Sequence, residues 1–170
     1  DQPNVRIVSL GCSSGEEPYT ISMVAHDSLG ASSARRVEVH ALDICTEVLE
    51  KAQTGVYPEF GVRELDPGVL QPPFLRGTGA NANLVQVAPE VRSLVRFQQG
   101  NLMDALPFSA RFDAVFCRNV TIYFDTETQR ALYQRIYDVL KPQGLFFMGS
   151  AESLVMSGLP FKHVQASVYR

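Results

Sequence analysis

Cysteine and histidine are both scarce in this sequence, with three residues of each in 170. Cys12, Cys45 and Cys117 are odd in number and widely spaced, and none forms a Cys-x-x-Cys pair. We therefore expect neither a disulfide framework nor a zinc site. The histidines are equally scattered, so we expect no bound metal. The cysteine pattern is typical of a reducing, cytoplasmic location.

The sequence also lacks an excess of positive charge and any long apolar run. Its 15 Lys and Arg against 18 Asp and Glu give a net charge of −3, which excludes a basic nucleic-acid-binding domain on global charge. No apolar run approaches the roughly 20 residues of a membrane-spanning helix, and no signal peptide is visible, so we expect no membrane insertion. The length and the apolar content of 45% fit one globular domain over residues 1–170.

Strand-like and helix-like stretches alternate along the chain. This alternation predicts an α/β fold with a doubly wound, mostly parallel sheet and helices on both faces. Ligands in such folds bind outside the carboxyl ends of the strands. A Lys-Pro-Gln-Gly turn at 141–144 is expected to end the last helix. The predicted strands are 5–10, 37–42, 94–98, 112–117 and 145–148, with weaker ones at 161–164 and 166–169, and the predicted helices are 18–29, 46–54 and 126–140.

Residues 56–93 interrupt this alternation. They form a link far longer than the usual two to six residues or so. Two short apolar runs, 74–76 and 84–87, flank a Gly-Thr-Gly turn, which predicts a hairpin. The residues alone leave two interpretations open, a decorated surface loop or a small inserted module with its own role.

The turn after the first predicted strand reads Gly-Cys-Ser-Ser-Gly-Glu-Glu-Pro-Tyr. Gly11 lets the main chain come close to a ligand, and Ser13 and Ser14 are candidate N-caps of the next helix. A dinucleotide fold binds pyrophosphate at this helix start, and Glu16 and Glu17 would repel it. The turn therefore favours a ligand that is cationic or lacks phosphate. The alternative is that both glutamates only complement the helix dipole.

Polar residues also follow the second and third predicted strands. Asp43 stands roughly 30 residues after the first glycine, where doubly wound nucleotide sites place the acid that binds the ribose hydroxyls. The alternative is that Asp43 caps the next helix. Asn101 and Leu102 supply an amide and an apolar side chain that together can bond and cover a flat base.

The fourth predicted strand ends in Arg118 and Asn119, and Tyr123 follows. Polar groups at the end of a buried strand need partners, which a ligand or a salt bridge can supply. Together these strand ends describe a ligand with a ribose, a flat base and a positive charge but no phosphate. S-adenosylmethionine has these properties, and we predict it as the cofactor.

The segments 11–19, 43–52 and 116–124, with the turn at 141–144, resemble the chemotaxis receptor methyltransferase family, CheR. The resemblance covers nearly the whole chain. It implies a class I, Rossmann-like methyltransferase fold in which residues 56–93 form a small inserted antiparallel β-subdomain. It also implies methyl esterification of receptor glutamates, with S-adenosylhomocysteine as the product. The family's amino-terminal helical domain is not part of this sequence.

The resemblance also implies site residues and a docking surface. Tyr123 and Arg118 are the catalytic candidates, with Tyr123 near the transferred methyl group and the substrate carboxylate. The inserted hairpin would dock the receptor. Asn83 and Gln86 stand where tail-peptide-binding members have glycine and arginine, so we expect poor recognition of a receptor tail peptide. By motif position the cofactor contacts would be Gly11, Glu17, Asp43, Asn101, Leu102, Arg118 and Asn119.

The expected chemistry needs no general base, because a substrate glutamate with a pKa of about 4.3 is already ionised at neutral pH. The protein would contribute approach geometry in a dry site, with the Tyr123 hydroxyl holding the incoming carboxylate. Tyr123 packed under the next helix is the alternative. The runner-up function is a non-catalytic S-adenosylmethionine-binding interaction module, and a nucleotide dehydrogenase is disfavoured by the acidic first turn.

Overall fold

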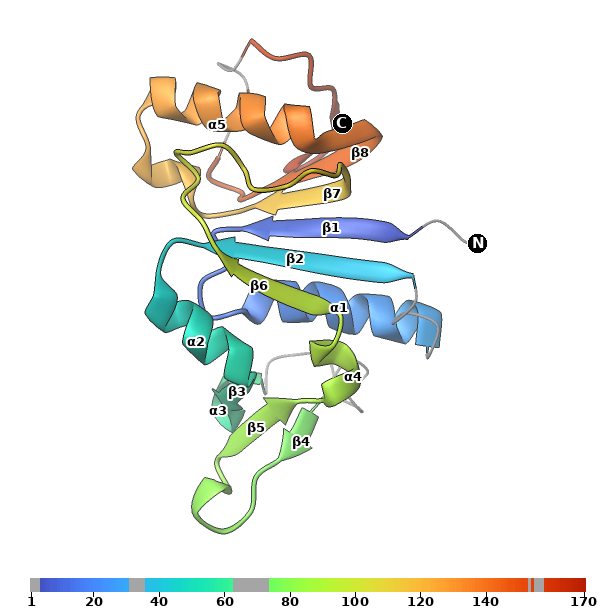
Figure 1. Ribbon diagram of the computed structural model, residues 1–170, viewed down its shortest axis with the longest axis vertical. Helices are drawn as coiled ribbons and strands as arrows, with labels where there is room; N and C mark the ends of the chain where they lie inside the picture. Colours follow the sequence, from blue (N-terminus) through green and yellow to red (C-terminus); the bar gives the residue numbers. More distant parts are fainter. Residues whose placement is uncertain (1–3, 31–35, 63–73, 153, 155–157) are drawn as a thin grey trace.

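The computed structural model of the protein describes residues 4–30, 36–62, 74–152, 154 and 158–170. Two sheets organise these residues, a large one of seven strands and a small one of three (Figure 1). The large sheet contains β1 (Val5–Leu10), β2 (Val37–Asp43), β6 (Val95–Gln99), β7 (Phe112–Cys117), β8 (Leu140–Met148), β9 (His163–Gln165) and β10 (Val168–Tyr169). The helices that flank it are α1 (Glu16–Leu29), α2 (Thr46–Thr54), α4 (Pro89–Arg92) and α5 (Thr126–Val139).

The strand order of the large sheet is β6-β2-β1-β7-β8-β10-β9. The first five strands in this order run parallel to one another, whereas β10 is antiparallel to β8 and β9. The predicted α/β fold with a doubly wound, mostly parallel sheet is thus confirmed. The chain builds outward from β1 to β2 and β6 and then returns to the other side of β1 as β7. In folds of this topology the ligand crevice lies at the reversal, beyond the carboxyl ends of β1 and β7.

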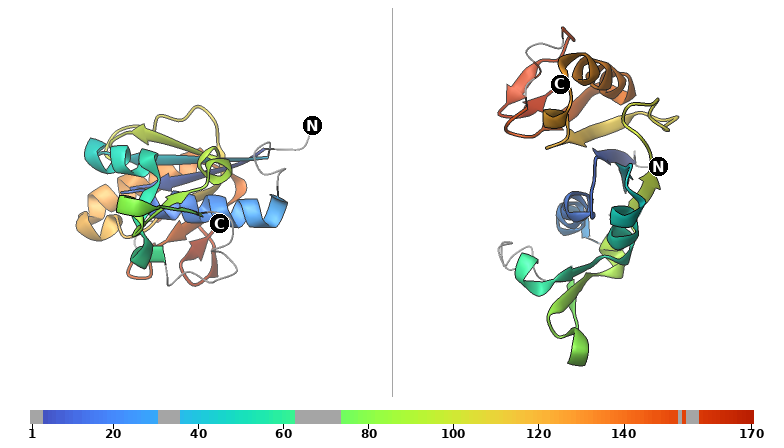
Figure 2. Two further views of the ribbon diagram at one scale, coloured as in Figure 1. Left: turned by 90° about the horizontal axis from the view of Figure 1, so that it is seen from below. Right: turned by 90° about the vertical axis from the view of Figure 1, so that its left-hand side faces the viewer.

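The two long helices cover opposite faces of the sheet. Alternate side chains of a strand point to opposite faces. Val8 and Leu10 of β1 are fully buried in the same core cluster as Ile136 of α5. Ser9, between Val8 and Leu10 in the strand, points to the other face, where its hydroxyl donates a hydrogen bond of 2.8 Å to Glu17 at the start of α1. The right-hand view of Figure 2 shows α1 and α5 apart from each other.

The small sheet lies at the end of the molecule far from α5 (Figure 1). It is antiparallel, with β5 (Leu84–Val87) between β3 (Val56–Pro58) and β4 (Phe74–Arg76), and a short helix, α3 (Glu59–Val62), follows β3. The predicted hairpin of β4 and β5 is confirmed, while β3 is an addition that sequence analysis missed. Tyr19 and Met23 of α1 pack with Tyr57 and Val85 of this sheet, so the small sheet has its own apolar contact with the main body. Residues 63–73 of the predicted insert lie outside the described residues.

Several predicted boundaries differ from those of the structure. α1 begins at Glu16, and Gly15, with a φ of +94°, occupies the N-cap without a side-chain cap. The Ser14 hydroxyl instead donates to the Glu16 carboxylate at 2.8 Å, so neither Ser13 nor Ser14 is the N-cap. The strands predicted at 161–164 and 166–169 are the shorter β9 and β10.

The predicted turn at 141–144 is also wrong, because these residues lie within β8. The strand begins at Leu140, directly after α5. Its register with β7 slips there, because Phe112 pairs with Leu140 and Ala114 already pairs with Leu145. Gln143 has a φ of +70° inside this irregularity. The Pro-Gly pair therefore produces a bulge, and the chain needs no separate turn between helix and strand.

Candidate active site

A cavity of about 440 Å³ lies at the carboxyl ends of β1, β2, β6 and β7. It contains six of the eight residues predicted for the site, and its other lining residues are mostly apolar. Parallel strands bring their ends together at one edge, which explains why residues scattered through the sequence meet here. The lining consists of Gly11, Asp43, Ile44, Gly100, Asn101, Leu102, Met103, Asn119, Val120, Tyr123 and Phe124.

The turn after β1 requires a glycine at position 11. Gly11 has a φ of +72°, and a Cβ atom there would collide with the Val120 side chain from the loop after β7. The N–H groups of Gly11 and Cys12 both donate to the carbonyl oxygen of Leu42, at 2.8 and 3.0 Å. The turn is therefore fixed to the end of β2 and brings the main chain of the β1 loop to the cavity.

Asp43 lines the cavity and joins the loop after β1 to the loop after β2. Its Oδ2 accepts a hydrogen bond of 2.8 Å from the Ser13 N–H, and its Oδ1 accepts one of 3.0 Å from the Cys45 N–H. Cys45 occupies the N-cap of α2, so Asp43 is not the cap itself. Each carboxylate oxygen has more than one lone pair, so two ribose hydroxyls can still donate to this group.

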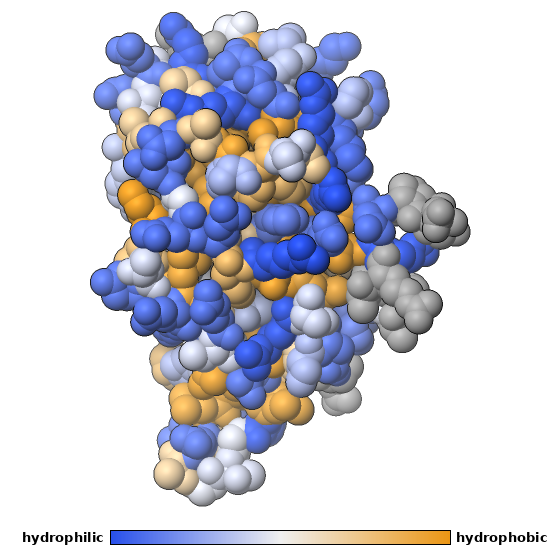
Figure 3. All heavy atoms as spheres, viewed as in Figure 1, coloured by the Kyte–Doolittle hydropathy of each residue, from blue (hydrophilic) through white to orange (hydrophobic). Residues whose placement is uncertain are grey.

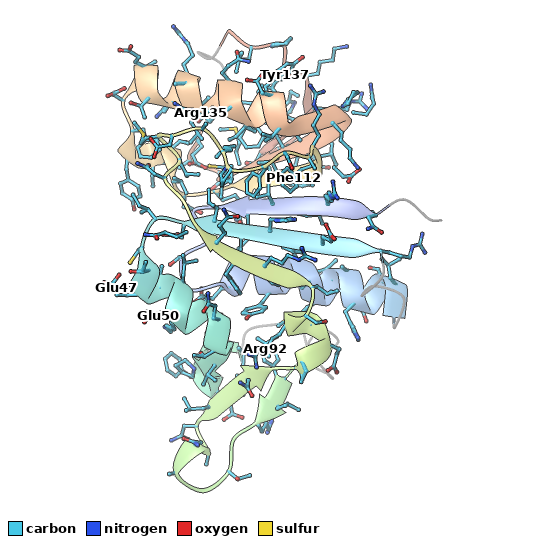
Figure 4. The ribbon with its side chains drawn as sticks, viewed as in Figure 1. Glu47, Glu50, Arg92, Phe112, Arg135 and Tyr137 are labelled. Carbon is cyan, nitrogen blue, oxygen red and sulfur yellow. The ribbon has the colours of Figure 1, made fainter. Side chains whose placement is uncertain are left out.

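Asn101 and Leu102 form the wall after β6. The Asn101 Oδ1 accepts from the Met103 N–H at 2.9 Å, so a ligand could use the side-chain NH₂ group. Leu102 is 8% exposed and belongs to the main core. Its carbonyl oxygen accepts a hydrogen bond of 3.2 Å from Arg135, which Figure 4 labels on α5. This wall combines an amide with apolar surface, as a flat base requires.

Glu17 and Arg118 do not line this cavity. They form an ion pair at 3.2 Å that links the first turn of α1 to the end of β7. Glu17 also accepts the hydrogen bond from Ser9 described above. The Arg118 side chain is 49% exposed and the Glu17 side chain 22% exposed, so a charged ligand could compete for either partner.

The loop after β7 depends on a residue that sequence analysis did not assign. Glu152 accepts hydrogen bonds from the N–H groups of Asn119, Val120 and Thr121 and from the Thr121 hydroxyl, at 2.7–3.1 Å. It also accepts one of 2.6 Å from the Gly149 N–H. The only signal in the sequence was an acidic residue shortly after a strand end.

Tyr123 lies at the rim of the cavity, in the short helix η3 (Thr121–Tyr123). It is 81% exposed, so it does not pack under α5.

Cys12, next to Gly11, is buried, and burial together with the carboxylates of Asp43, Glu17 and Glu16 raises its pKa to about 12. A thiol with this pKa is neutral at physiological pH and is a poor nucleophile.

The cavity fits the adenosine part of S-adenosylmethionine. The Asp43 carboxylate can accept from ribose hydroxyls, and Ile44, Leu102 and Met103 provide apolar surface for the base. Among the described residues that line it there is no Lys or Arg that would favour a phosphate. Among the described residues, no group of three or more His, Cys, Asp and Glu side chains could hold a metal ion. None of the helices in the described ranges is long and apolar enough to cross a membrane.

Comparison with solved structures supports the class that this fold and cavity define. A glycopeptide N-methyltransferase, MtfA, complexed with S-adenosylmethionine has a TM-score of 0.54 to this chain at 18% identity. The match covers 85% of this chain and 46% of MtfA. The fold is that of class I S-adenosylmethionine-dependent methyltransferases.

The sequence comparisons identify the family. Residues 1–170 match the family described as "CheR methyltransferase, SAM binding domain", and the chain belongs to it. "Chemotaxis protein methyltransferase 2" of Pseudomonas aeruginosa is 42% identical over 166 residues, which are 97% of this chain and 59% of that protein. "Chemotaxis protein methyltransferase" of Escherichia coli strain K12 is 45% identical over 149 residues, 87% of this chain and 52% of that protein. The chain therefore spans little more than half the length of these relatives.

Proposed function

We propose that the chain is the catalytic domain of an S-adenosylmethionine-dependent protein-glutamate O-methyltransferase that acts on chemotaxis-type receptors. The observation that carries the proposal is one cavity with Asp43 on its wall and Tyr123 at its exposed rim. A cofactor bound at Asp43 would be reached by a protein side chain from the Tyr123 side. The names of the relatives support the choice of chemotaxis receptors as substrates.

In this proposal the bound cofactor supplies a methyl group activated by the sulfonium. Asp43 holds the ribose hydroxyls, and the main chain at Gly11 and the side chains of Asn119 and Leu102 complete the contacts. In the proposal, the charged amino-acid end of the cofactor extends beyond the described cavity lining to the Glu17–Arg118 ion pair, whose carboxylate and guanidinium can pair with an ammonium and a carboxylate.

Tyr123 receives the substrate. Its hydroxyl donates a hydrogen bond to the incoming glutamate carboxylate and aligns one oxygen for in-line attack on the methyl carbon. The substrate carboxylate is ionised at neutral pH, so no residue has to remove a proton. The protein's contribution is then approach geometry and exclusion of water.

The small sheet is the proposed docking surface for the receptor. In the order β3-β5-β4, β4 pairs with β5 alone among the described residues, so its other edge can accept an added strand. A depression of about 380 Å³, lined in part by Leu75, Arg76 and Gln86, lies on this sheet. A receptor docked at the small sheet would have to extend to the rim of the cavity at the large sheet.

Recognition of a receptor tail peptide is proposed to be weak. The Gln86 side-chain NH₂ donates to the carbonyl oxygen of Thr54 at 3.0 Å and is thus engaged with the end of α2. Arg76 forms an ion pair with Glu59 at 3.5 Å. The positive contact available to a tail carboxylate is therefore reduced.

The proposal also places the reaction in the cytoplasm and gives nucleic acid no part in it. Three free cysteines and a net charge of −3 support these two points.

Methyl transfer from radiolabelled S-adenosylmethionine to the intact cytoplasmic part of a chemotaxis receptor tests the proposal. We expect incorporated label that is released as methanol at alkaline pH, because carboxyl methyl esters hydrolyse there. Calorimetry with S-adenosylhomocysteine, and with NAD as the control, measures cofactor binding separately. Tight S-adenosylhomocysteine binding without any methyl transfer would favour the non-catalytic interaction module instead.

A further inference from the structure

The side chain of Glu152 is the meeting point of two loops. It follows β8 in the sequence and reaches the loop after β7, about 30 residues away. Oε1 accepts from the Val120 N–H, the Thr121 N–H and the Thr121 hydroxyl, at 3.1, 2.8 and 2.7 Å. Oε2 accepts from the Asn119 N–H at 3.1 Å and the Gly149 N–H at 2.6 Å.

Five donors around one side chain require a carboxylate. A glutamine has only one oxygen that can accept these bonds. Its NH₂ group would take the place of the other oxygen and would face N–H groups, which are themselves donors and cannot accept a hydrogen bond. Burial raises the pKa of Glu152, but the hydrogen bonds from Thr121, Gly149 and Asn119 outweigh burial and lower it overall. The ionised form is the one that the two loops stabilise.

The position of Glu152 also depends on Gly149. A Cβ atom at position 149 would lie 2.7 Å from Oε2 of Glu152 and 3.0 Å from the Asn119 nitrogen. A side chain there would push the carboxylate away from its donors. The close approach of the two loops is therefore built into the backbone.

The loop of residues 119–124, which follows β7, contributes four residues to the cavity wall. Asn119, Val120, Tyr123 and Phe124 all line the cavity. Asn119 has a φ of +59°, a left-handed conformation that needs support from its surroundings. On the other side of the segment, the Gln129 side chain of α5 donates to the carbonyl oxygens of Thr121 and Phe124, at 2.8 and 3.0 Å. Both edges of this main chain are thus fixed, and the exposed Tyr123 takes its position from it.

We propose that Glu152 is a positioning residue of the methyltransferase, whose carboxylate holds the Asn119–Thr121 main chain so that Asn119 meets the cofactor and Tyr123 meets the substrate carboxylate. The proposal rests on the proposed function for the role of Tyr123. It assigns Glu152 no contact with the substrate and no proton transfer.

Glu152→Gln tests the proposal, with Asp125→Asn as the matched control. Asp125 also accepts a main-chain N–H, that of Thr128 at 2.8 Å, but it caps α5 and bonds none of residues 118–121. For Glu152→Gln we expect kcat to fall between about tenfold and about 100-fold, the scale of a small misplacement of catalytic groups. The affinity for S-adenosylhomocysteine should fall about fivefold, while KM for the receptor stays unchanged because docking occurs elsewhere.

Amide hydrogen exchange supplies a readout independent of activity. Exchange should speed up in residues 118–124 of Glu152→Gln and stay at the wild-type rate there in Asp125→Asn. Asp125→Asn should also keep the wild-type kcat and S-adenosylhomocysteine affinity, even where its Tm falls. Glu152→Asp retains the charge on a shorter side chain and should show an intermediate kcat, which keeps the test open if Glu152→Gln does not fold.

Three outcomes would overturn the inference. The first is wild-type kcat and affinity in Glu152→Gln despite faster exchange, which would make the residue structural only. The second is an equal loss of kcat in Asp125→Asn. The third is wild-type kcat in Glu152→Asp when Glu152→Gln is unfolded. An inactive wild-type chain would contradict the proposed function alone, since affinity and exchange would still decide the role of Glu152.

Discussion

The large-sheet cavity and the small sheet differ in how their exposed groups are held. At the cavity, the carboxylates of Asp43 and Glu152 accept main-chain N–H groups from neighbouring loops, so the loops are fixed before any ligand arrives. On the small sheet, Leu75 is 51% exposed, Phe60 of α3 is 74% exposed, and one edge of β4 pairs with no strand of the described residues. Figure 3 shows apolar side chains gathered over this lower part of the molecule.

This difference indicates a division of labour. A fixed cavity suits a small cofactor whose geometry decides the chemistry. An open strand edge with apolar neighbours suits a protein partner, because main-chain pairing gives affinity and side-chain pockets give specificity. Perturbing one region should therefore leave the function of the other intact.

Asp43→Ala should weaken S-adenosylhomocysteine binding by about 1–3 kcal/mol, the scale for unpairing hydrogen bonds to a charged group. Part of this loss would arise because the N–H groups of Ser13 and Cys45 would lose the Asp43 carboxylate as their acceptor. Isothermal calorimetry measures the loss. Glu50→Ala is the control, since Glu50 is an exposed carboxylate on α2, labelled in Figure 4. Unchanged affinity in Asp43→Ala would refute the ribose assignment.

Tyr123→Phe should lower the methylation rate about tenfold and leave S-adenosylhomocysteine affinity unchanged, because it removes one hydrogen bond to a charged group. The side chain is 81% exposed, so the loss of its hydroxyl should not destabilise the fold. Steady-state kinetics with the receptor and calorimetry with the product give the two numbers. If affinity and rate fall together, Tyr123 serves the cofactor and not the substrate.

Shortening the hairpin loop should weaken only the binding of the receptor. The Gly77 N–H donates to the Leu84 carbonyl oxygen at 2.9 Å, so these residues pair at the end of β4 and β5. Replacing residues 78–83 by Asn-Gly gives the two-residue turn that hairpins favour and keeps this pairing. We expect KM for the receptor to rise about fivefold, as for the loss of about 1 kcal/mol of contact at an interface.

The same variant also tests the separation of the two regions. Its affinity for S-adenosylhomocysteine and its kcat at saturating receptor should match the wild type. A loss of cofactor affinity would show that the loop supports the cavity and that the two regions are coupled.

The fold was predictable from the sequence because buried parallel strands read as short apolar runs between helical stretches. β3 was missed because a three-residue strand ending in Pro58 carries no periodicity. The bulge in β8 was read as a turn because Pro and Gly are typical of both.

The cavity was predictable for a similar reason, since the ends of parallel strands meet at one edge. Six predicted residues line it because each follows a predicted strand. Glu152 escaped assignment because its donors in the loop after β7 lie about 30 residues away, and no local pattern in the sequence shows such a contact. The pairing of Glu17 with Arg118 across the crevice was equally invisible.

A hydrogen bond from Arg135 joins the wall after β6 to α5, and a substitution of Arg135 tests how much that bond matters. Arg135 donates to the Leu102 carbonyl oxygen at 3.2 Å. This bond is longer than the 2.8 Å bonds that Asp43 accepts from the Ser13 N–H and Glu152 accepts from the Thr121 N–H. Arg135→Met removes the donor and keeps an apolar stem over the core. We expect S-adenosylhomocysteine affinity to fall only about twofold to fivefold, the scale of one modest hydrogen bond.

The control for Arg135→Met is Gln134→Met, on the adjacent and exposed position of α5, where the side chain bonds only Asp138 in the structure described. That variant should bind S-adenosylhomocysteine like the wild type, and neither variant should change KM for the receptor. A loss in Arg135→Met as large as that in Asp43→Ala would mean that the wall after β6 governs cofactor binding. The cavity would then depend on the packing of α5 as much as on the carboxylate of Asp43 in its wall.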